Sequence, residues 1–129
     1  MKRVYFEQYG GPEVIKLEDA PIPEVSEGQV LLKMEAAGIS KPDFLMRTGA
    51  YPWTKGILPF YPGLYGTGTV AAVGAGVTSV SVGDLVFVDH PVFCGCYSQY
   101  KLAPEGNVTK MIAGTDPVYG AVMTNYVIA

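Results

Sequence analysis

The sequence is poor in residues that bind transition metals, with two cysteines and one histidine among 129 residues. A catalytic zinc site needs about three cysteine, histidine or carboxylate ligands and one open position. Cys94, Cys96 and His90 lie close together in the sequence, but no fourth ligand accompanies them. We therefore predict that no metal binds and that the cysteines act as small buried apolar side chains.

The spacing of the two cysteines argues against a disulfide between them. On a single predicted strand, Cys94 and Cys96 point to the same face, and such neighbours rarely pair. The N-terminal residues 1–7, MKRVYFE, turn acidic too early for a secretory signal peptide. We expect reduced cysteines and a cytoplasmic location.

The chain has no basic cluster and no long apolar run. Nine Lys and Arg residues against twelve Asp and Glu residues give a formal net charge of −3, which offers nucleic acid no electrostatic footprint. No apolar stretch reaches the roughly 20 residues that a membrane span needs. We expect a soluble protein without a nucleic-acid or membrane partner.

What the sequence does contain is β-branched residues punctuated by glycine, most clearly along residues 59–88. β-Branched side chains suit a pleated, half-buried surface. Glycine within a strand marks a bend, a bulge or a close backbone approach. Gly83 and Asp84 predict a turn into a buried strand over residues 85–88. Further strands are predicted over residues 2–8, 14–19, 29–37, 96–102 and 108–112. The fold class is thus mostly β, a small barrel with short helices in one domain.

Two segments predict helix. Residues 41–47 carry Pro42 in the first turn, Ser40 as N-cap and Gly49 as the stop. Residues 50–61 are an irregular aromatic loop, and residues 116–129 show near-helical spacing of apolar side chains.

The spacing P-G-x-x-x-x-G-x-V-x-x-V-G-x-x-V-x-x-x-x-x-G-D-x-V, from Pro62 to Val86, resembles a family signature. It is similar to that of the GroES-like catalytic domain of the medium-chain dehydrogenase/reductase superfamily. More narrowly, the chain resembles the zinc-free quinone oxidoreductase branch. The resemblance extends to the opening hairpin at residues 9–14, the active-site loop at residues 37–43 and the G-x-Y-x-x-Y motif at residues 95–100.

The resemblance implies hydride transfer from NADPH to a small-molecule quinone or enone, without metal. The zinc-dependent branch has a cysteine at the position of Ser40 and a His-Glu pair at Leu64 and Tyr65, so those ligands are missing here. The roles that the resemblance implies are catalytic for Ser40 and Asp43, substrate-binding for Tyr51, Arg47 and Trp53, and cofactor-binding for Ser40 and Asn125.

Structural interpretations stay open beside these roles. Ser40 and Asp43 also fit a capping box, which needs no catalysis, and Ser40 stands where the branch has asparagine. Tyr51 and Trp53, with Phe60 and Tyr61, would equally cover the mouth of the barrel.

In the resembled family a Rossmann domain follows the barrel. No strand, glycine-rich loop and helix with a downstream acidic residue is found in this sequence. We expect residues 1–115 to form an incomplete GroES-like domain and residues 116–129 to begin the helix toward a missing cofactor domain. The chain alone should then bind NADPH weakly, and the intact enzyme could be an oligomer. The alternative is a non-enzymatic β-barrel module that acts in assembly or interaction.

Overall fold

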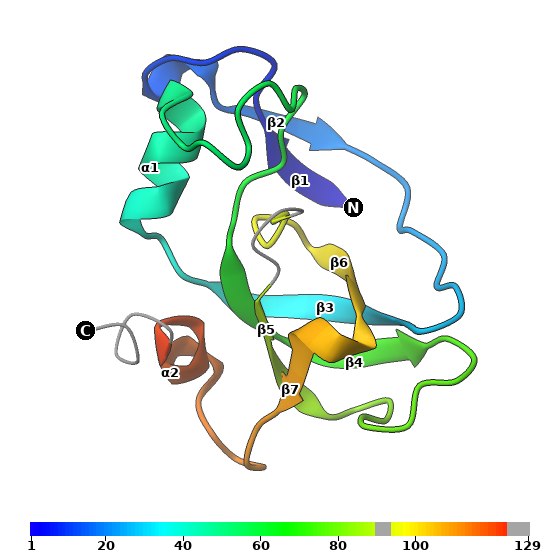
Figure 1. Cartoon of the computed structure of the whole chain (residues 1–129). Helices are drawn as coiled ribbons and strands as arrows, with labels where there is room; N and C mark the ends of the chain where they lie inside the picture. The colour runs from blue at the N-terminus through cyan, green and yellow to red at the C-terminus, as the bar shows by residue number, and fades with distance from the viewer. Residues whose placement is uncertain (90–93, 124–129) are drawn as a thin grey trace.

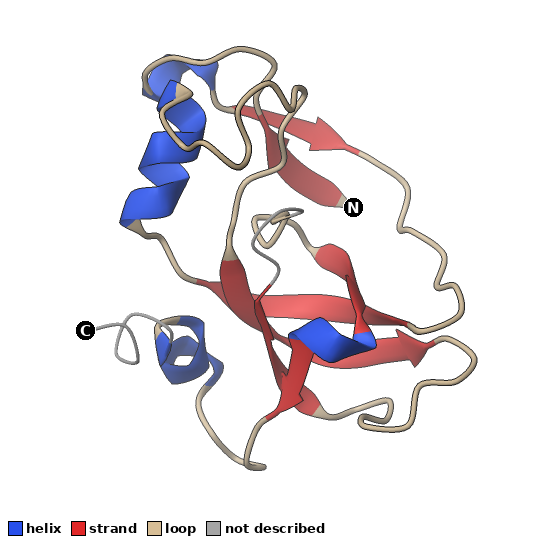
Figure 2. Ribbon diagram, in the orientation of Figure 1, coloured by secondary structure: helices blue, strands red, loops and turns tan. Residues whose placement is uncertain are grey.

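The computed structural model describes residues 1–89 and 94–123, in which most of the regular secondary structure is β-strand (Figure 1). The strands are β1 (Lys2–Tyr5), β2 (Lys16–Asp19), β3 (Gln29–Ala37), β4 (Tyr65–Val73), β5 (Leu85–Asp89), β6 (Tyr100–Pro104) and β7 (Val108–Lys110). Helices α1 (Lys41–Thr48) and α2 (Pro117–Ala121) and the 3₁₀ turns η1 (Pro12–Val14) and η2 (Glu105–Asn107) are short (Figure 2). The predicted mostly-β class is confirmed.

Five strands form one antiparallel sheet in the order β6-β3-β4-β5-β7. The two outermost strands are consecutive in the chain, joined only by η2. Four strand spacings in a flat sheet would separate them by about 19 Å. The four residue steps from Pro104 to Val108 span at most about 14 Å. The sheet must therefore curl to bring its edges together, which gives a half-barrel.

Glycines of β4 allow this curvature. A side chain at Gly66 would place its Cβ 2.5 Å from the Ala36 carbonyl oxygen, and one at Gly68 would approach the Lys33 carbonyl at 2.8 Å. The register of β3 against β4 shifts between Leu31 and Leu32 and again between Met34 and Ala36. Gly66 and Gly68 thus permit the close approach of the β4 backbone to the β3 backbone, as the glycine pattern of the sequence predicted.

The hydrophobic core has two parts. The larger cluster fills the curled sheet and includes Val30, Leu32, Val70, Val86 and Val88. The smaller cluster consists of Phe6, Val14, Met46, Phe60 and Cys94. Three of its members come from just after β1, from η1 and from α1, which lie above the sheet in Figure 1. The hairpin and α1 are thus held to the barrel by a core of their own.

The predicted strand over residues 96–102 is wrong at its start, because β6 begins at Tyr100. Gly95 adopts a left-handed φ of 87°, which interrupts an extended strand. Cys94 packs in the smaller cluster and Cys96 in the larger one, so the two cysteines do not share one strand. Residues 97 and 99 instead bond to β1, through Val4 N–H to the Tyr97 carbonyl and Gln99 N–H to the Lys2 carbonyl.

Candidate functional site

The site is built on the first turn of α1. Ser40 is extended (φ −139°, ψ 170°), and its backbone N–H donates to Asp43 Oδ2 at 2.9 Å. Pro42 occupies the first turn, and Gly49 ends the helix with φ 77°. The predicted N-cap, capping-box partner and helix stop are confirmed.

Asp43 is 8% exposed and accepts three hydrogen bonds. Besides the Ser40 amide, the Ser40 hydroxyl donates to Oδ2 at 2.9 Å and the Gly63 N–H donates to Oδ1 at 3.3 Å. The carboxylate thus links α1 to the segment that leads into β4. Because the Ser40 proton is directed at Asp43, the lone pairs of Ser40 Oγ remain to accept a further hydrogen bond.

Beside this pair lies a cavity of about 380 Å³. It brings together Ser40, Asp43 and Arg47, three of the five predicted site residues that the structure describes. Its other lining side chains are mostly apolar: Val4, Phe6, Ile15, Ile39, Phe44 and Pro62, together with Tyr97. An apolar cavity with a few convergent polar groups is the usual form of a small-molecule site.

Tyr97 is a polar residue of this cavity to which the sequence assigned no role. Its hydroxyl donates to the Gly38 carbonyl oxygen at 3.0 Å. Burial, and then the Asp43 carboxylate, raise the pKa of Tyr97, so the phenol stays protonated at neutral pH. The G-x-Y-x-x-Y motif contained the signal, since Tyr97 is its first tyrosine.

Arg47 lines the cavity, but its guanidinium is engaged with the turn before η1. It donates to the Gly10 carbonyl oxygen at 2.7 Å and lies 5.4 Å from the centre of the Phe44 ring. The Gly10 N–H in turn donates to the Arg47 carbonyl. Arg47 therefore fixes the opening turn against α1.

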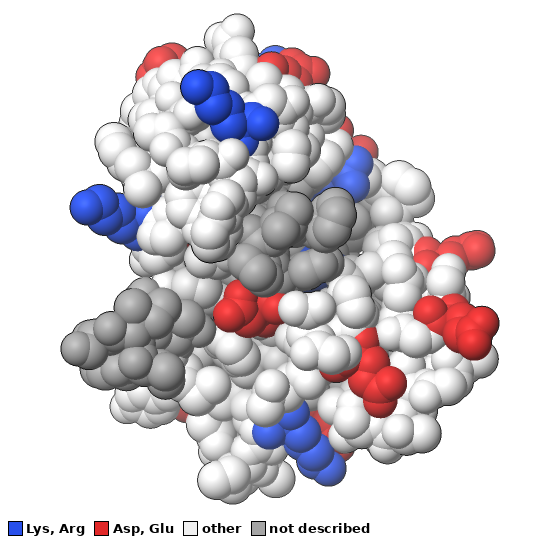
Figure 3. Space-filling view, in the orientation of Figure 1, with Lys and Arg blue, Asp and Glu red and all other residues white. Residues whose placement is uncertain are grey.

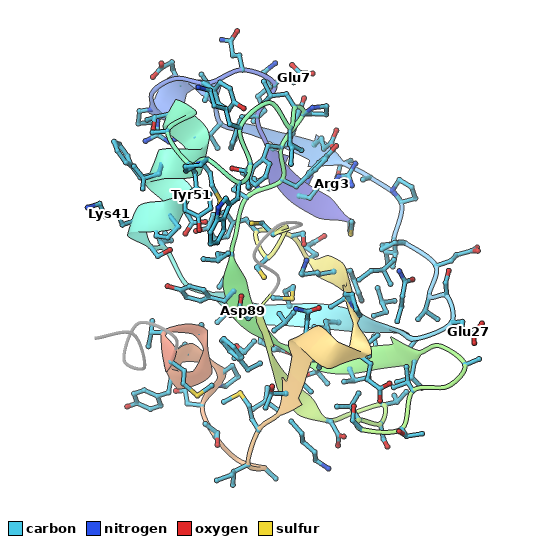
Figure 4. The ribbon with its side chains drawn as sticks, in the orientation of Figure 1. Arg3, Glu7, Glu27, Lys41, Tyr51 and Asp89 are labelled. Atoms are coloured by element: carbon cyan, nitrogen blue, oxygen red, sulfur yellow. The ribbon has the colours of Figure 1, made fainter. Side chains whose placement is uncertain are left out.

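Tyr51 and Trp53 do not line this cavity. The half-buried Tyr51 ring packs against the smaller core cluster, in the loop beside α1 (Figure 4). Trp53 is 71% exposed and meets Tyr51 edge-on at 5.9 Å between ring centres. Their substrate roles stay predictions, and Asn125 and His90 lie outside the described residues.

The described residues contain no group of three or more His, Cys, Asp or Glu side chains that could hold a metal ion. Both cysteines are buried, and neither forms a disulfide. Burial raises the pKa of each thiol to about 12, which disfavours the thiolate that binds metals.

The glycines do not form a cradle for a dinucleotide. Gly66 and Gly68 lie in β4, where they admit β3. A side chain at Gly74 would overlap the carbonyl oxygen of Ser26, so this glycine also serves packing. Residues 1–89 and 94–123 thus contain no glycine-rich loop of the type that binds the pyrophosphate of a dinucleotide. The apolar cavity beside Ser40 and Asp43 is therefore the candidate substrate site.

The visible surface carries scattered charges. On the face in Figure 3 the Lys and Arg side chains are spread out and do not gather into one basic patch. Over the described part of the chain, no helix is long and apolar enough to cross a membrane.

Comparison with known proteins agrees with this fold. Residues 26–129 match the family model of the alcohol dehydrogenase GroES-like domain. The chain belongs to this family of the medium-chain dehydrogenase/reductase superfamily. Its similar relatives include the quinone oxidoreductase of Lama guanicoe, 38% identical over 122 residues, which are 94% of this chain and 36% of that protein.

Solved structures of quinone oxidoreductases have a similar fold. The quinone oxidoreductase of Coxiella burnetii has a TM-score of 0.85 and 31% identity, covering 94% of this chain and 40% of that one. The Escherichia coli quinone oxidoreductase complexed with NADPH has a TM-score of 0.89 and 26% identity, covering 99% and 40%. The chain thus spans about a third of the length of the curated relatives it matches.

Proposed function

We propose that this chain is the N-terminal, substrate-side part of a zinc-independent, NADPH-dependent reductase of quinones or enones. The observation that carries the proposal is the apolar cavity at the capped start of α1, in a chain whose relatives are quinone oxidoreductases. One relative, from Solanum lycopersicum, is a 2-methylene-furan-3-one reductase, 38% identical over 81% of this chain. Its substrate is an enone, which agrees with the chemical class proposed here.

In the proposed reaction NADPH, when bound, supplies the hydride. The protein's task is to hold a flat, conjugated carbonyl compound against apolar walls and to place polar groups at its oxygen. Phe6, Phe44 and Pro62 provide such walls. Ser40 is the polar group of the cavity whose partner, Asp43, already accepts two other donors. Its hydroxyl can therefore leave Asp43 and donate to a carbonyl oxygen without stranding the carboxylate.

Asp43 acts in this proposal as a positioning residue. Its three hydrogen bonds hold Ser40 in the extended conformation and tie α1 to Gly63. Arg47 likewise holds the opening turn through Gly10. We further propose that Tyr51 and Trp53 contact the far end of the substrate, and that the helix begun by α2 continues toward a cofactor domain, with Asn125 near the cofactor.

The test is a chimera that replaces the corresponding N-terminal segment of the Escherichia coli quinone oxidoreductase with this chain. We expect the chimera to oxidise NADPH in the presence of 1,4-benzoquinone, and the 129-residue chain alone to show negligible turnover. Elemental analysis should find no stoichiometric zinc in either protein. A folded chimera that binds NADPH but reduces neither quinone nor enone would contradict the proposal and favour a non-enzymatic module.

Variants of the active chimera separate the proposed roles. Ser40→Ala should lower kcat/KM by about 100- to 1,000-fold, as expected for loss of one polarising donor. Thr48→Ala is the matched control, because the Thr48 hydroxyl donates to carbonyls of its own helix, those of Phe44 and Leu45. Equal activity of Ser40→Ala and the parent would show that Ser40 serves only as a cap.

A further inference from the structure

A second cavity, of about 250 Å³, adjoins the cavity at α1, with which it shares Val4 and Tyr97 in its lining. Its walls include Arg3 of β1, Tyr61 of the aromatic loop, Tyr97, Ser98 and Lys101 of β6. A cavity of this size is smaller than a drug-sized pocket and suits a molecule of a few heavy atoms.

Lys101 is the unusual member of this cavity. It is 6% exposed, whereas lysine is almost never fully buried without a partner. Its position explains its burial: Lys101 pairs with Leu32 of β3, which is fully buried. Directly paired residues of adjacent strands point to the same face of a sheet. The next pair, Lys33 with Tyr100, faces the other way, and Lys33 is exposed.

No carboxylate neutralises Lys101 within the described residues. The ion pairs there join Lys2 to Asp19, Arg3 to Glu18, Lys16 to Glu7, and Lys110 to Asp84. Among the residues that the structure describes, the Lys101 amine donates to one acceptor, the Cys94 carbonyl oxygen. A buried ammonium without a counter-charge is costly, and the group avoids that cost by losing its proton.

The groups that face Lys101 agree with a neutral amine. Burial lowers the pKa of Lys101 below its ordinary value of 10.5. The Cys94 and Cys96 thiols, whose ionisation would raise that pKa, have pKa values of about 12 and stay neutral. Arg3 also lines the cavity, and its positive charge is balanced by Glu18 at 2.7 Å. Two of the three tyrosines that line the cavity, Tyr61 and Tyr97, have raised pKa values, so their phenols stay protonated and uncharged at neutral pH.

We propose that Lys101 is a nucleophilic amine that forms an imine with a small aldehyde or ketone bound in this cavity. The amine nitrogen attacks the carbonyl carbon, and the carbonyl oxygen takes one proton from the nitrogen to give a carbinolamine. The C–O bond then breaks, and the oxygen leaves as water with the second proton of the amine. A desolvated lysine is the residue that performs this chemistry at neutral pH. The inference is independent of the proposed reductase function.

The test is trapping of the imine with cyanoborohydride, which supplies the hydride that converts it to a stable secondary amine. The chain is treated at pH 7 with limiting propanal, and peptide mapping measures the rate of propylation at each lysine and at the N-terminal amine. Lys41 is the internal reference, since it is exposed and points away from the molecule at the start of α1 (Figure 4). A pKa one unit lower leaves roughly tenfold more neutral amine at pH 7. We expect Lys101 to react several-fold faster than Lys41.

A bulky aldehyde such as 1-pyrenecarboxaldehyde distinguishes the cavity from mere reactivity. We expect it to label Lys41 and to spare Lys101. Lys101→Met should abolish the fast propylation and keep the fold, because methionine retains an apolar stem of similar length, and Lys41→Met should leave the fast reaction unchanged. Slower reaction of Lys101 than of Lys41 with propanal, or equal access of the bulky aldehyde to both, would overturn the proposal even if Lys101→Met failed to fold.

Discussion

Replacement of Asp43 by alanine removes the group that joins α1 to the rest of the domain. The substitution deletes the acceptor for the Ser40 N–H, the Ser40 hydroxyl and the Gly63 N–H. The Gly63 donor is buried, and Gly63 itself has a left-handed φ of 101° held by its surroundings. We expect both the helix start and the path into β4 to weaken.

The magnitude follows from these contacts. Loss of a helix cap costs about 1 kcal/mol. A buried N–H left without an acceptor costs about 1–3 kcal/mol. Removal of a buried carboxylate also relieves its own desolvation, which offsets part of the loss. We therefore expect Asp43→Ala to lower the free energy of unfolding by about 2–3 kcal/mol, a large part of the stability of a domain this size.

Urea unfolding followed by circular dichroism measures this change. Asp116→Ala is the matched control, because Asp116 is an exposed N-cap that accepts one hydrogen bond from Val118 N–H at 2.9 Å. It should cost about 1 kcal/mol or less. Loss of the Asp43 charge should also lower the pKa of Tyr97, visible in an ultraviolet titration. An Asp43→Ala midpoint equal to that of Asp116→Ala would refute the account of Asp43 as a link between α1 and Gly63.

Other expectations follow from single contacts. Gly74→Ala should destabilise by about 3 kcal/mol in urea, since its Cβ meets the Ser26 carbonyl, whereas Gly106→Ala, with open space around it, should change stability by under about 1 kcal/mol. Cys94 and Cys96 should resist iodoacetamide at pH 8 in the folded chain and react once it is unfolded, and rapid native alkylation would contradict their burial. The pKa of Lys101 is lower in the folded chain than its ordinary value of 10.5, so the unfolded chain binds the Lys101 proton more tightly. The free energy of unfolding of the parent, relative to that of Lys101→Met, should therefore rise as the pH increases toward 10.5. A pH-independent difference between these two proteins would show that Lys101 titrates normally. In the active chimera, Tyr51→Ala should lower kcat/KM for a quinone by about tenfold, and an unchanged kcat/KM with a large fall in urea midpoint would identify Tyr51 as a core residue only.

Local chemistry was readable from the sequence wherever neighbours in the chain decide the outcome. Ser40, Pro42, Asp43 and Gly49 define the start and end of α1 through contacts within a few residues, and α1 has those ends. The β3 bounds and the turn at Gly83 were predictable for the same reason, because strand patterning and a left-handed glycine act locally. The glycine and valine spacing of residues 62–86 also identified the family, which residues 26–129 confirm.

Long-range pairing decided the rest. The strand predicted from Cys96 fails because Tyr97 and Gln99 bond to β1, some 95 residues earlier in the chain, and no local pattern encodes that partner. Burial of Lys101 follows from its register opposite Leu32, and a register one residue away would place its amine in water. Tyr97 lines the cavity beside Ser40 and Asp43, whereas Tyr51 does not. This difference depends on how the β1–β2 hairpin, α1 and the segment before β6 pack together. Sequence neighbours set the secondary structure here, whereas strand register and packing between distant segments set which polar groups face a cavity.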